Sequence, residues 1–168
     1  KEMEPVLHLL PAPRRLREGG GVFTLPMDTR IVLDRPHALL RTAASQLQAE
    51  LKSACGLTVP VICGQAQPGD IALIGDRQDG QSGEAYTLRI VPEGVMIRGG
   101  SPQALLWGVQ TLRQVVRQCG WKLPEVRIED APVFKARGFY HDVTRGRVPT
   151  LSWLKRLAMI SASALAVS

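Results

Sequence analysis

The residues best suited to bind a ligand lie in a short run near the C-terminal end of the chain. Residues 134–145 read Phe-Lys-Ala-Arg-Gly-Phe-Tyr-His-Asp-Val-Thr-Arg, a strand-like stretch that contains Arg137, Asp142 and Arg145. A guanidinium group offers five donors in a planar fork and stays protonated, so Arg137 is suited to hold two neighbouring hydroxyl groups. An ion pair between Arg137 and Asp142, or another carboxylate, is the open alternative. We expect Asp142 and Arg145 to form a structural ion pair that fixes the connection after this strand.

The cysteine and histidine residues do not indicate metal or cofactor chemistry. The cysteines form no CxxC pair and the histidines are scattered; these residues are Cys55, Cys63, Cys119, His8, His37 and His141. Ligands at short, regular spacing are typical of zinc sites, and an even number of cysteines is typical of a disulfide framework. We therefore expect no metal and no cofactor.

Length and composition are those of a globular protein. The chain has 168 residues, of which 45% are hydrophobic and 21% charged, and a formal net charge of +6. It can bury a core of ordinary size, in one domain or in one domain plus part of another. The basic residues are spread along the chain, which argues against nucleic-acid binding. No run approaches the length of a membrane span, so no membrane partner is expected, and the sequence assigns no compartment.

Two segments have the periodicity of helices with one apolar side. Residues 36–54 and 102–119 repeat apolar side chains at spacings of three and four, which predicts amphipathic helices. Asp34 and Ser101 are the expected N-caps. Gly108, inside the second helix, costs about 1 kcal/mol relative to Ala. We expect it to allow a close approach between this helix and a sheet.

Short runs rich in β-branched residues, separated by Gly and Pro, predict several strands. They are residues 22–25, 31–33, 59–63, 71–74, 86–90 and 95–98. The last two flank Pro-Glu-Gly, a loop suited to a β-hairpin. Because each helix has a single apolar stripe, we expect both to pack on one face of the sheet. The sequence thus predicts an α+β domain over residues 1–131 with a mostly antiparallel sheet.

Several short motifs together resemble glycoside hydrolase family 20, the β-N-acetylhexosaminidases. Residues 107–114 read Trp-Gly-Val-Gln-Thr-Leu-Arg-Gln, which is similar to the Gly-x-Gln-Thr-Leu-x-Gln signature that closes the small domain before the barrel in that family. Residues 84–88 resemble the hairpin entry of that domain, and residues 128–134 resemble its bridge into the barrel. The Arg-Gly pair at Arg137 and the run at residues 142–145 then occupy the matching places in the first barrel strand.

The resemblance implies two parts in this chain. Residues 1–131 would be the N-terminal non-catalytic domain, and residues 132–168 the first strand and helix of a (β/α)8 barrel. A complete barrel needs roughly 250 residues, so we expect an incomplete one here. In the family, the Arg of the Arg-Gly pair binds the 3- and 4-hydroxyls of the sugar at the cleavage site, a role that falls on Arg137 by resemblance. The chain departs from the family at Gly146-Arg147, where His-Phe is usual.

The resemblance also implies that the catalytic groups lie beyond this chain. Family members carry an adjacent Asp-Glu pair on the fourth barrel strand, where the Glu protonates the glycosidic oxygen and the Asp orients the attacking 2-acetamido group of the substrate. The only adjacent acidic pair here, Glu129-Asp130, precedes the barrel, so we assign no catalytic residue. The implied parent removes terminal N-acetylhexosamine from glycans by retaining hydrolysis, and this chain alone is inactive. A stand-alone carbohydrate-binding or protein-interaction module is the alternative.

A lone barrel strand and helix would leave apolar surface uncovered. The segment after about residue 132 then packs back on the small domain, is partly disordered or pairs with another copy. We hypothesise that residues 150–168 mediate self-association, through the stripe Leu154, Leu157, Ala158 and Leu165. Light scattering that shows a monomer, with an unchanged state after deletion of residues 147–168, would contradict this hypothesis.

Overall fold

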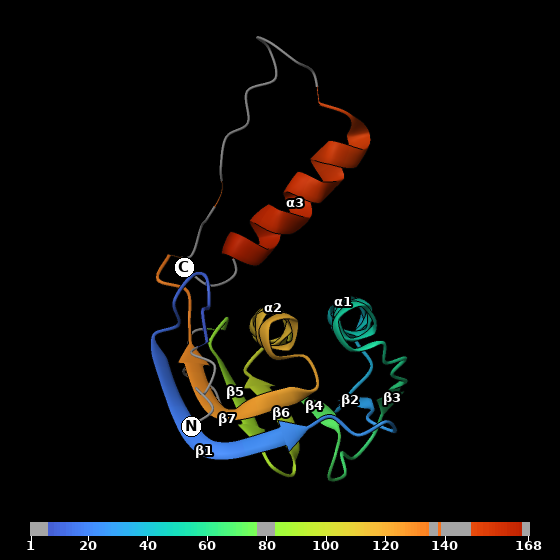
Figure 1. The fold of residues 1–168 in the computed structure, drawn as a ribbon. Coiled ribbons are helices and arrows are strands. Elements are labelled where there is room, and N and C mark those ends of the chain that lie inside the picture. The colour runs from blue at the N-terminus through green and yellow to red at the C-terminus, as the bar shows by residue number, and fades with distance from the viewer. Residues whose placement is uncertain (1–6, 77–82, 135–137, 139–148, 166–168) are drawn as a thin grey trace.

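A β-sheet covered on one face by two helices forms the body of the protein (Figure 1). The computed structural model describes residues 7–76, 83–134, 138 and 149–165. Helices α1 and α2 lie side by side on the sheet, and α3 lies beyond them. The elements in chain order are β1 (Arg15–Thr24), β2 (Ile31–Leu33), α1 (Ala38–Cys55), β3 (Val61–Cys63), β4 (Ile71–Gly75), β5 (Tyr86–Val91), β6 (Gly94–Gly99), α2 (Pro102–Cys119), β7 (Lys122–Asp130) and α3 (Leu151–Leu165).

The sheet is mixed, which corrects the expectation of a mostly antiparallel one. Its strand order is β1-β7-β5-β6-β4-β2-β3. The pairs β1–β7, β7–β5 and β5–β6 are antiparallel, whereas β6–β4, β4–β2 and β2–β3 are parallel. A parallel pair needs a crossover long enough to return the chain to the same end of the sheet, and α1 supplies it between β2 and β3. The helical period of residues 36–54 between two predicted strands was therefore the signal for parallel pairing.

Helix α1 has a different N-cap from the expected Asp34. Its cap is His37, whose Nδ1 accepts a hydrogen bond from the Leu39 amide at 3.1 Å. Asp34 instead accepts a hydrogen bond from the Gly75 amide at 2.8 Å, which ties the end of β2 to the end of β4. Because its carboxylate is engaged there, the helix begins two residues later than predicted. Its end at Gly56, in the left-handed region with φ 70°, is confirmed.

Helix α2 begins and ends where the sequence predicts. Ser101 Oγ accepts a hydrogen bond from the backbone amide three residues later, at 3.1 Å, and Pro102 occupies the first turn. Gly108 lies against the sheet, where a Cβ atom would collide with the Ile97 side chain and lie 3.1 Å from Cδ2 of Tyr86. The predicted close approach of helix and sheet is confirmed.

A charged network joins α1 to α2. The carboxylate of Glu50, a buried residue of α1, accepts hydrogen bonds from Nε of Arg117 at 2.9 Å and Nε of Arg113 at 3.3 Å. Burial raises the pKa of Glu50, but the hydrogen bonds and positive charges of Arg117 and Arg113 outweigh burial, and the net shift of its pKa is downward. The network therefore fixes how the two helices lie relative to each other.

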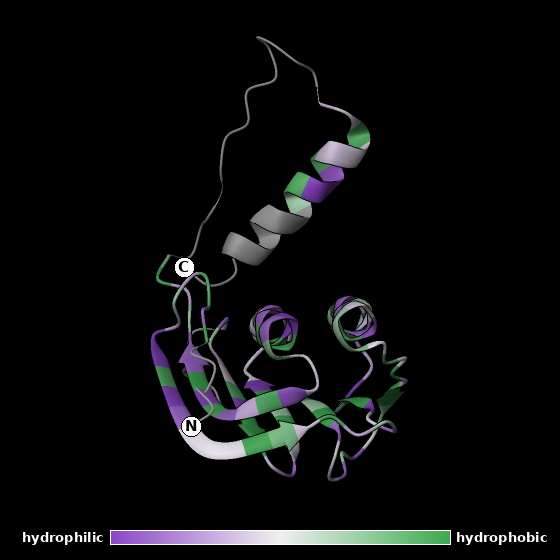
Figure 2. Ribbon diagram, viewed as in Figure 1, coloured by the Kyte–Doolittle hydropathy of each residue, from purple (hydrophilic) through white to green (hydrophobic). Residues whose placement is uncertain are grey.

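The hydrophobic core lies between the sheet and the two helices. Figure 2 shows hydrophobic residues on the sides of α1 and α2 that face the sheet. Burying one aliphatic side chain contributes about 1.5–3 kcal/mol, so a continuous core of this kind holds the strands rigidly. Fully buried side chains from both layers include Ile31, Leu47, Ile71, Leu88, Ile97, Leu105 and Leu112.

Two glutamines of α2 hold the N-terminal segment. Gln118 accepts from the amide of His8 at 2.9 Å and donates to its carbonyl at 2.8 Å, and Gln114 does the same with Leu10, at 3.0 Å in both directions. Positions four apart on a helix rise about 6 Å, and alternate residues of an extended chain are about 6.6 Å apart, so the two spacings match. The apolar side chains that alternate with these two residues, Leu7 and Leu9, are buried.

Strand β7 and the first part of β1 lie outside the predicted strands. The register of β1 against β7 shifts between Glu18 and Val22, so the run of three glycines is a bulge within one strand and not the end of a strand. Glu125 of β7 covers this bulge, and its Oε2 accepts a hydrogen bond from the Gly21 amide at 2.9 Å. A Cβ atom on Gly19 would lie 2.5 Å from Cδ of Glu125. A side chain at Gly19 would therefore have to displace the Glu125 carboxylate from the bulge.

Helix α3 lies, in the sequence, within the segment that the resemblance assigns to the first barrel strand and helix. Thr150 Oγ1 accepts a hydrogen bond from the Trp153 amide at 3.3 Å and so caps its first turn. Most of the strand expected around residues 134–145 lies outside the described residues, so the start of a barrel and a domain boundary after residue 131 stay predictions.

The apolar side chains at the start of α3 are accessible. Leu151 is 68% exposed, Trp153 44% and Leu154 38%, whereas Leu157 is partly buried. None of residues 150–158, the part of the proposed segment whose side-chain exposure is described, is fully buried. Self-association through residues 150–168 stays a prediction.

Candidate functional site

The ligand-binding residues predicted from the sequence lie outside the described part of the chain. Arg137, Asp142 and Arg145 belong to the stretches 135–137 and 139–148. The sugar-binding role of Arg137 and the ion pair of Asp142 with Arg145 therefore stay predictions. A polar hollow opens at the end of β7, a few residues before these stretches in the sequence.

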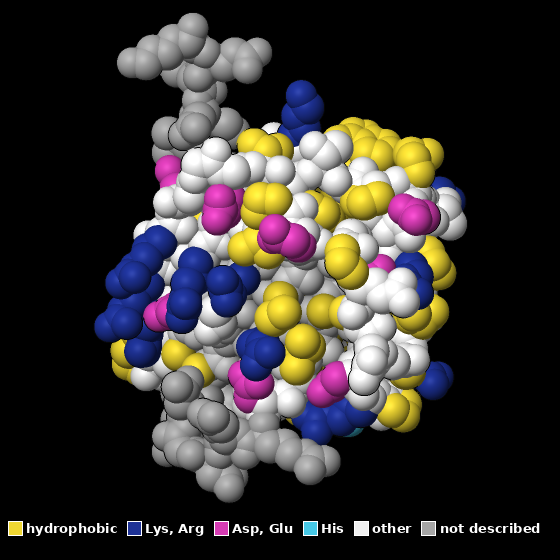
Figure 3. All heavy atoms as spheres, turned by 90° about the horizontal axis from the view of Figure 1, so that it is seen from below, with side chains coloured by type: hydrophobic (Ala, Val, Ile, Leu, Met, Phe, Trp, Pro, Cys, Tyr) yellow, Lys and Arg dark blue, Asp and Glu magenta, His cyan; other side chains and the backbone are white. Residues whose placement is uncertain are grey.

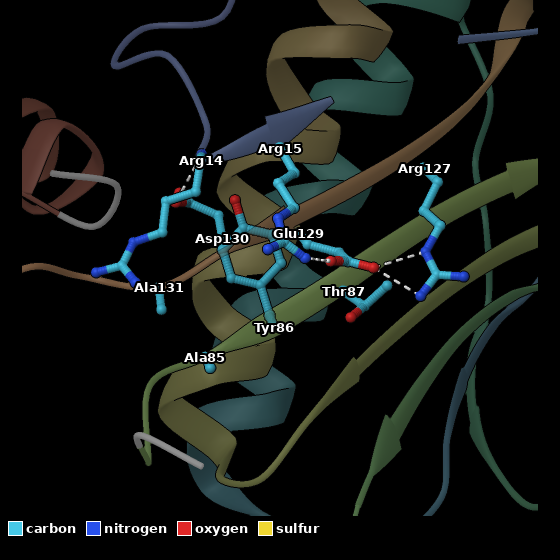
Figure 4. Close-up of a pocket in the computed structure, with 9 residues that line it drawn as sticks. All are labelled: Arg14, Arg15, Ala85, Tyr86, Thr87, Arg127, Glu129, Asp130 and Ala131. Atoms are coloured by element: carbon cyan, nitrogen blue, oxygen red, sulfur yellow. Dashed lines mark hydrogen bonds and ion pairs between the residues drawn. The ribbon is translucent and has the colours of Figure 1, made fainter. Parts of the chain in front are cut away.

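The hollow lies where β7 ends and β1 and β5 begin, beside the point at which the chain leaves the sheet (Figure 4). It has a volume of about 340 Å³. Three arginines and two carboxylates line it, so its surface is mainly polar. The lining residues are Arg14, Arg15, Ala85, Tyr86, Thr87, Arg127, Glu129, Asp130 and Ala131.

Asp130 is the buried acid of this site. It is 6% exposed, and its Oδ1 accepts a hydrogen bond from the Arg14 amide at 3.2 Å. Its Oδ2 is buried without a hydrogen-bond partner in the described residues, although the Tyr86 hydroxyl and the Ala131 amide lie close enough to influence its titration. Burial raises the pKa of Asp130, and the neighbouring donors only partly oppose that shift.

The Tyr86 hydroxyl extends this polar cluster into the core. It forms a hydrogen bond with Thr111 Oγ1 at 2.6 Å, between β5 and α2. Burial raises the pKa of Tyr86 far above its ordinary value, and the charge of Asp130 adds to this. The phenol therefore stays neutral in the physiological range and acts as a structural hydrogen-bonding group.

Arg14 joins the entry of the domain to its exit. Its backbone amide binds Asp130, and its Nη2 donates to the Pro132 carbonyl at 3.3 Å. The two partners are more than a hundred positions away in the sequence; Asp130 is the last residue of β7, and Pro132 is the second residue after it. The segment before β1 is thus tied to the end of β7 by two hydrogen bonds, one through the Asp130 side chain and one through the Arg14 side chain.

Glu129 is held by two arginines on the outer side of the strand. Its Oε1 accepts hydrogen bonds from Arg127, at 2.8 Å from Nε and 2.6 Å from Nη2, and its Oε2 lies 3.5 Å from Nη1 of Arg15. The hydrogen bond from Arg127 lowers the pKa of Glu129, and the charges of Arg127 and Arg15 add to this. A carboxylate that stays ionised in this way is poorly suited to protonate a leaving group.

The neighbouring acids Glu129 and Asp130 project to opposite faces of β7. Successive side chains of a strand alternate between faces, and Figure 4 shows Glu129 beside Arg15 and Arg127 while Asp130 turns toward Arg14. Two carboxylates arranged in this way do not both reach one glycosidic bond. The geometry is that of a structural junction.

Metal-binding clusters and membrane spans are absent from the described residues. No group of three or more His, Cys, Asp or Glu side chains there is placed to hold a metal ion. Among the described helices, none combines the length and apolar character that crossing a membrane requires.

The sequence gives no indication of the role of Arg14 and Tyr86 in this junction. It places Asp130 only in the predicted bridge between the small domain and the barrel. A signal for its position existed, since Val126, Ile128 and Asp130 alternate with polar residues as on a strand with one buried face. No local signal connects Arg14 to it.

The comparisons with known proteins agree with this architecture. Residues 6–131 match the family model described as glycosyl hydrolase family 20, domain 2. A β-hexosaminidase of Vibrio furnissii is 34% identical over 156 residues, which cover 90% of this chain and 24% of that protein. A β-hexosaminidase of Porphyromonas gingivalis is 29% identical over 154 residues, which cover 86% of this chain and 20% of that protein.

A solved structure shares the fold over most of the chain. The family 20 exo-β-N-acetylglucosaminidase of Vibrio harveyi, solved with N-acetylglucosamine, matches with a TM-score of 0.76 at 23% identity, over 92% of this chain and 24% of that one. This chain spans a quarter or less of the length of these three proteins. Because the family model matches well over half of its residues, the chain belongs to glycoside hydrolase family 20 and contains that family's domain 2.

Proposed function

We propose that this chain is the non-catalytic supporting domain of a β-N-acetylhexosaminidase-type glycoside hydrolase. The parent enzyme removes terminal N-acetylhexosamine residues from glycans by retaining hydrolysis in which the substrate's own acetamido group attacks. The observation that carries the proposal is the lock between Arg14 and Asp130, at the place where the match to domain 2 ends.

The lock supports a positioning role through its burial. Asp130 is buried in the rigid sheet, and its hydrogen bond with Arg14 fixes the backbone on both sides of the junction. The guanidinium of Arg14 holds the Pro132 carbonyl, the second residue after β7. A segment that continues from this point starts in a fixed place and direction, which is what a barrel strand docked on this domain requires.

Within this proposal the residues that contact sugar lie after the domain. Arg137 binds the 3- and 4-hydroxyls of the terminal sugar, and Asp142 with Arg145 stabilises the loop beside it. The acid pair of β7 does not serve as the catalytic pair, because its members face opposite sides of the strand. The family match does not favour the alternative of a stand-alone binding module.

Activity of the chain alone is the first test. The 168-residue chain is incubated with p-nitrophenyl N-acetyl-β-D-glucosaminide, and no release of p-nitrophenol is expected. Turnover by this chain that disappears in Arg137→Ala would show that the chain is itself catalytic and would refute the proposal.

A chimeric enzyme tests the supporting role directly. Residues 6–131 replace the corresponding domain of the Vibrio furnissii β-hexosaminidase, and a folded, active chimera is expected. In that chimera Asp130→Leu removes the acceptor for the Arg14 amide, so activity and thermal stability should both fall. Asp28→Leu, a change at an exposed loop acid, is the matched control. Equal activity of the two variants would contradict the proposal that the hydrogen bond between Arg14 and Asp130 helps this domain to support the barrel.

A further inference from the structure

Five arginines gather on the face of the sheet that α1 and α2 leave open. Figure 3 views this face and shows Lys and Arg side chains gathered toward one side of it. All five lie on β1, β5, β6 and β7, and all are exposed. We call them the arginine face; they are Arg15, Arg17, Arg89, Arg98 and Arg127.

Three of these arginines share one row across the sheet. Arg17 of β1 lies opposite Arg127 of β7, and Arg127 lies opposite Arg89 of β5. The flanking residues of Arg127 and Arg89 are buried, so both side chains point away from the helices. Neighbouring strands are about 4.8 Å apart, and like charges directly opposite each other are destabilising. On a solvent-exposed face with no other role, we would expect positive and negative side chains to alternate along such a row.

Acidic side chains compensate this face only in part. Glu129 is paired with Arg15 and Arg127, and Asp76 is paired with Arg98 at 3.3 Å. Within the described residues, Arg17 and Arg89 form no hydrogen bond or ion pair through their side chains, although the charge of Arg17 acts on Glu129 from a distance. Their guanidinium groups are therefore available to an outside anion, at opposite ends of the row centred on Arg127.

From this placement we infer that the arginine face binds a linear acidic polysaccharide, sulfated or carboxylated. A guanidinium fork binds sulfate and carboxylate groups with two parallel hydrogen bonds. The two guanidinium groups of Arg17 and Arg89, separated by the strand that carries Arg127, match a ligand whose anionic groups repeat along a chain. Binding of an anion there would reduce the repulsion within the row.

The described surface favours a polysaccharide over the other polyanions. Proteins that bind single-stranded nucleic acids offer aromatic side chains on which bases stack. The exposed aromatic side chains of the described residues are Phe134 and Trp153, which lie outside the sheet. The choice of a glycan also rests on the proposed function, since the domain belongs to a family of glycoside hydrolases.

Binding of the 168-residue chain to a heparin dodecasaccharide is the test, by isothermal titration at several salt concentrations. The variant Arg17→Ser/Arg89→Ser removes the two free guanidinium groups and keeps the pair of Arg127 with Glu129. We expect about tenfold weaker binding at 0.15 M salt, and a salt dependence of log K that is reduced by about two. The thermal midpoint should rise in this variant, because the repulsion in the row is removed.

The matched control is Arg41→Ser/Lys52→Ser, which removes the same charge from exposed positions of α1, on the other side of the sheet. Binding close to that of the unchanged chain is expected. No heparin binding by the unchanged chain would overturn the inference, as would equal losses in both variants. Tighter binding to single-stranded DNA of equal charge, or to phosphatidylserine vesicles, would overturn it in favour of another partner. None of these readouts depends on hydrolysis, so they do not test the proposed function.

Discussion

The clamp formed by Gln114 and Gln118 on the N-terminal segment yields a prediction that the structure makes quantitative. The double variant Gln114→Leu/Gln118→Leu removes the four hydrogen bonds to His8 and Leu10 while the helix keeps good helix formers. Each bond contributes about 0.5–1 kcal/mol net. The variant should therefore weaken docking of the segment by about 2–4 kcal/mol.

That loss exceeds the net free energy of docking. Burial of the two leucines of the segment contributes about 3–6 kcal/mol. Ordering about five residues costs about 5–10 kcal/mol. With the four hydrogen bonds the terms nearly balance in favour of docking, and without them the segment should be released while the rest of the fold stays intact.

Amide hydrogen exchange measured by NMR is the assay. The amides of His8 and Leu10 donate to glutamine side chains, so in the double variant both should lose the protection that docking gives them and exchange at the rate of an undocked segment. Gln103→Leu, at another glutamine of α2, is the control and should leave both amides unchanged. Gln114→Glu/Gln118→Glu keeps the acceptors and loses the donors, so it should fall between them. Protection that stays within threefold of the unchanged chain in the leucine variant would refute the clamp.

Three further predictions concern buried residues in the sheet or next to it, namely Gly108 of α2, Asp70 before β4 and Asp130 of β7. Gly108→Val forces a side chain onto Ile97 and should lower the free energy of unfolding by about 1–3 kcal/mol in urea titrations; an unchanged midpoint would contradict the close packing. The hydrogen bond from Arg30 lowers the pKa of Asp70, so the stabilisation by this pair is present above about pH 4 and is lost as the pH falls through the lowered folded pKa. Asp70→Asn should be less stable than the unchanged chain at pH 7, and the two free energies of unfolding should become equal in acid. A difference in stability that persists in acid would argue against the ion pair of Arg30 with Asp70. Burial raises the pKa of Asp130, so ionising this carboxyl group costs stability at a pH above its raised folded pKa. Asp130→Asn should therefore be at least as stable as the unchanged chain at pH 7, and it should lose any advantage as the pH falls through the raised pKa. Clear destabilisation of Asp130→Asn at pH 7 in thermal melts would count against this prediction.

The sequence predicted the two helices well because their periodicity is local. The range 102–119 is confirmed for α2, and α1 differs only at its start, where Asp34 binds β4 and does not cap the helix. Local patterns did not predict β7, because it contains Pro124, and proline is unfavourable in a strand. In the structure this proline pairs with Val22 directly after the bulge in β1, at an irregular part of the ladder that tolerates it.

The candidate site was less predictable than the fold. Asp130 appeared in the sequence as part of a family motif, but its burial and its lock with Arg14 depend on the pairing of β1 with β7. The prediction of a mostly antiparallel sheet was wrong for the same reason, because parallel pairing depends on which end of the sheet each connecting segment returns to. The predicted sugar ligand Arg137 stays a prediction outside the described residues.

By itself, the sequence determined the family, the helices and the hairpin, because motifs and periodicity are properties of neighbouring residues. Only the tertiary structure decided that Arg14 meets Asp130 at the exit of the domain, and that Arg17, Arg127 and Arg89 form one row. Both depend on strand register, which long-range pairing sets: a shift of one residue would turn these side chains to the other face of the sheet. Arg137 could therefore be singled out from a local motif, whereas the row of Arg17, Arg127 and Arg89 could be found only from the strand register.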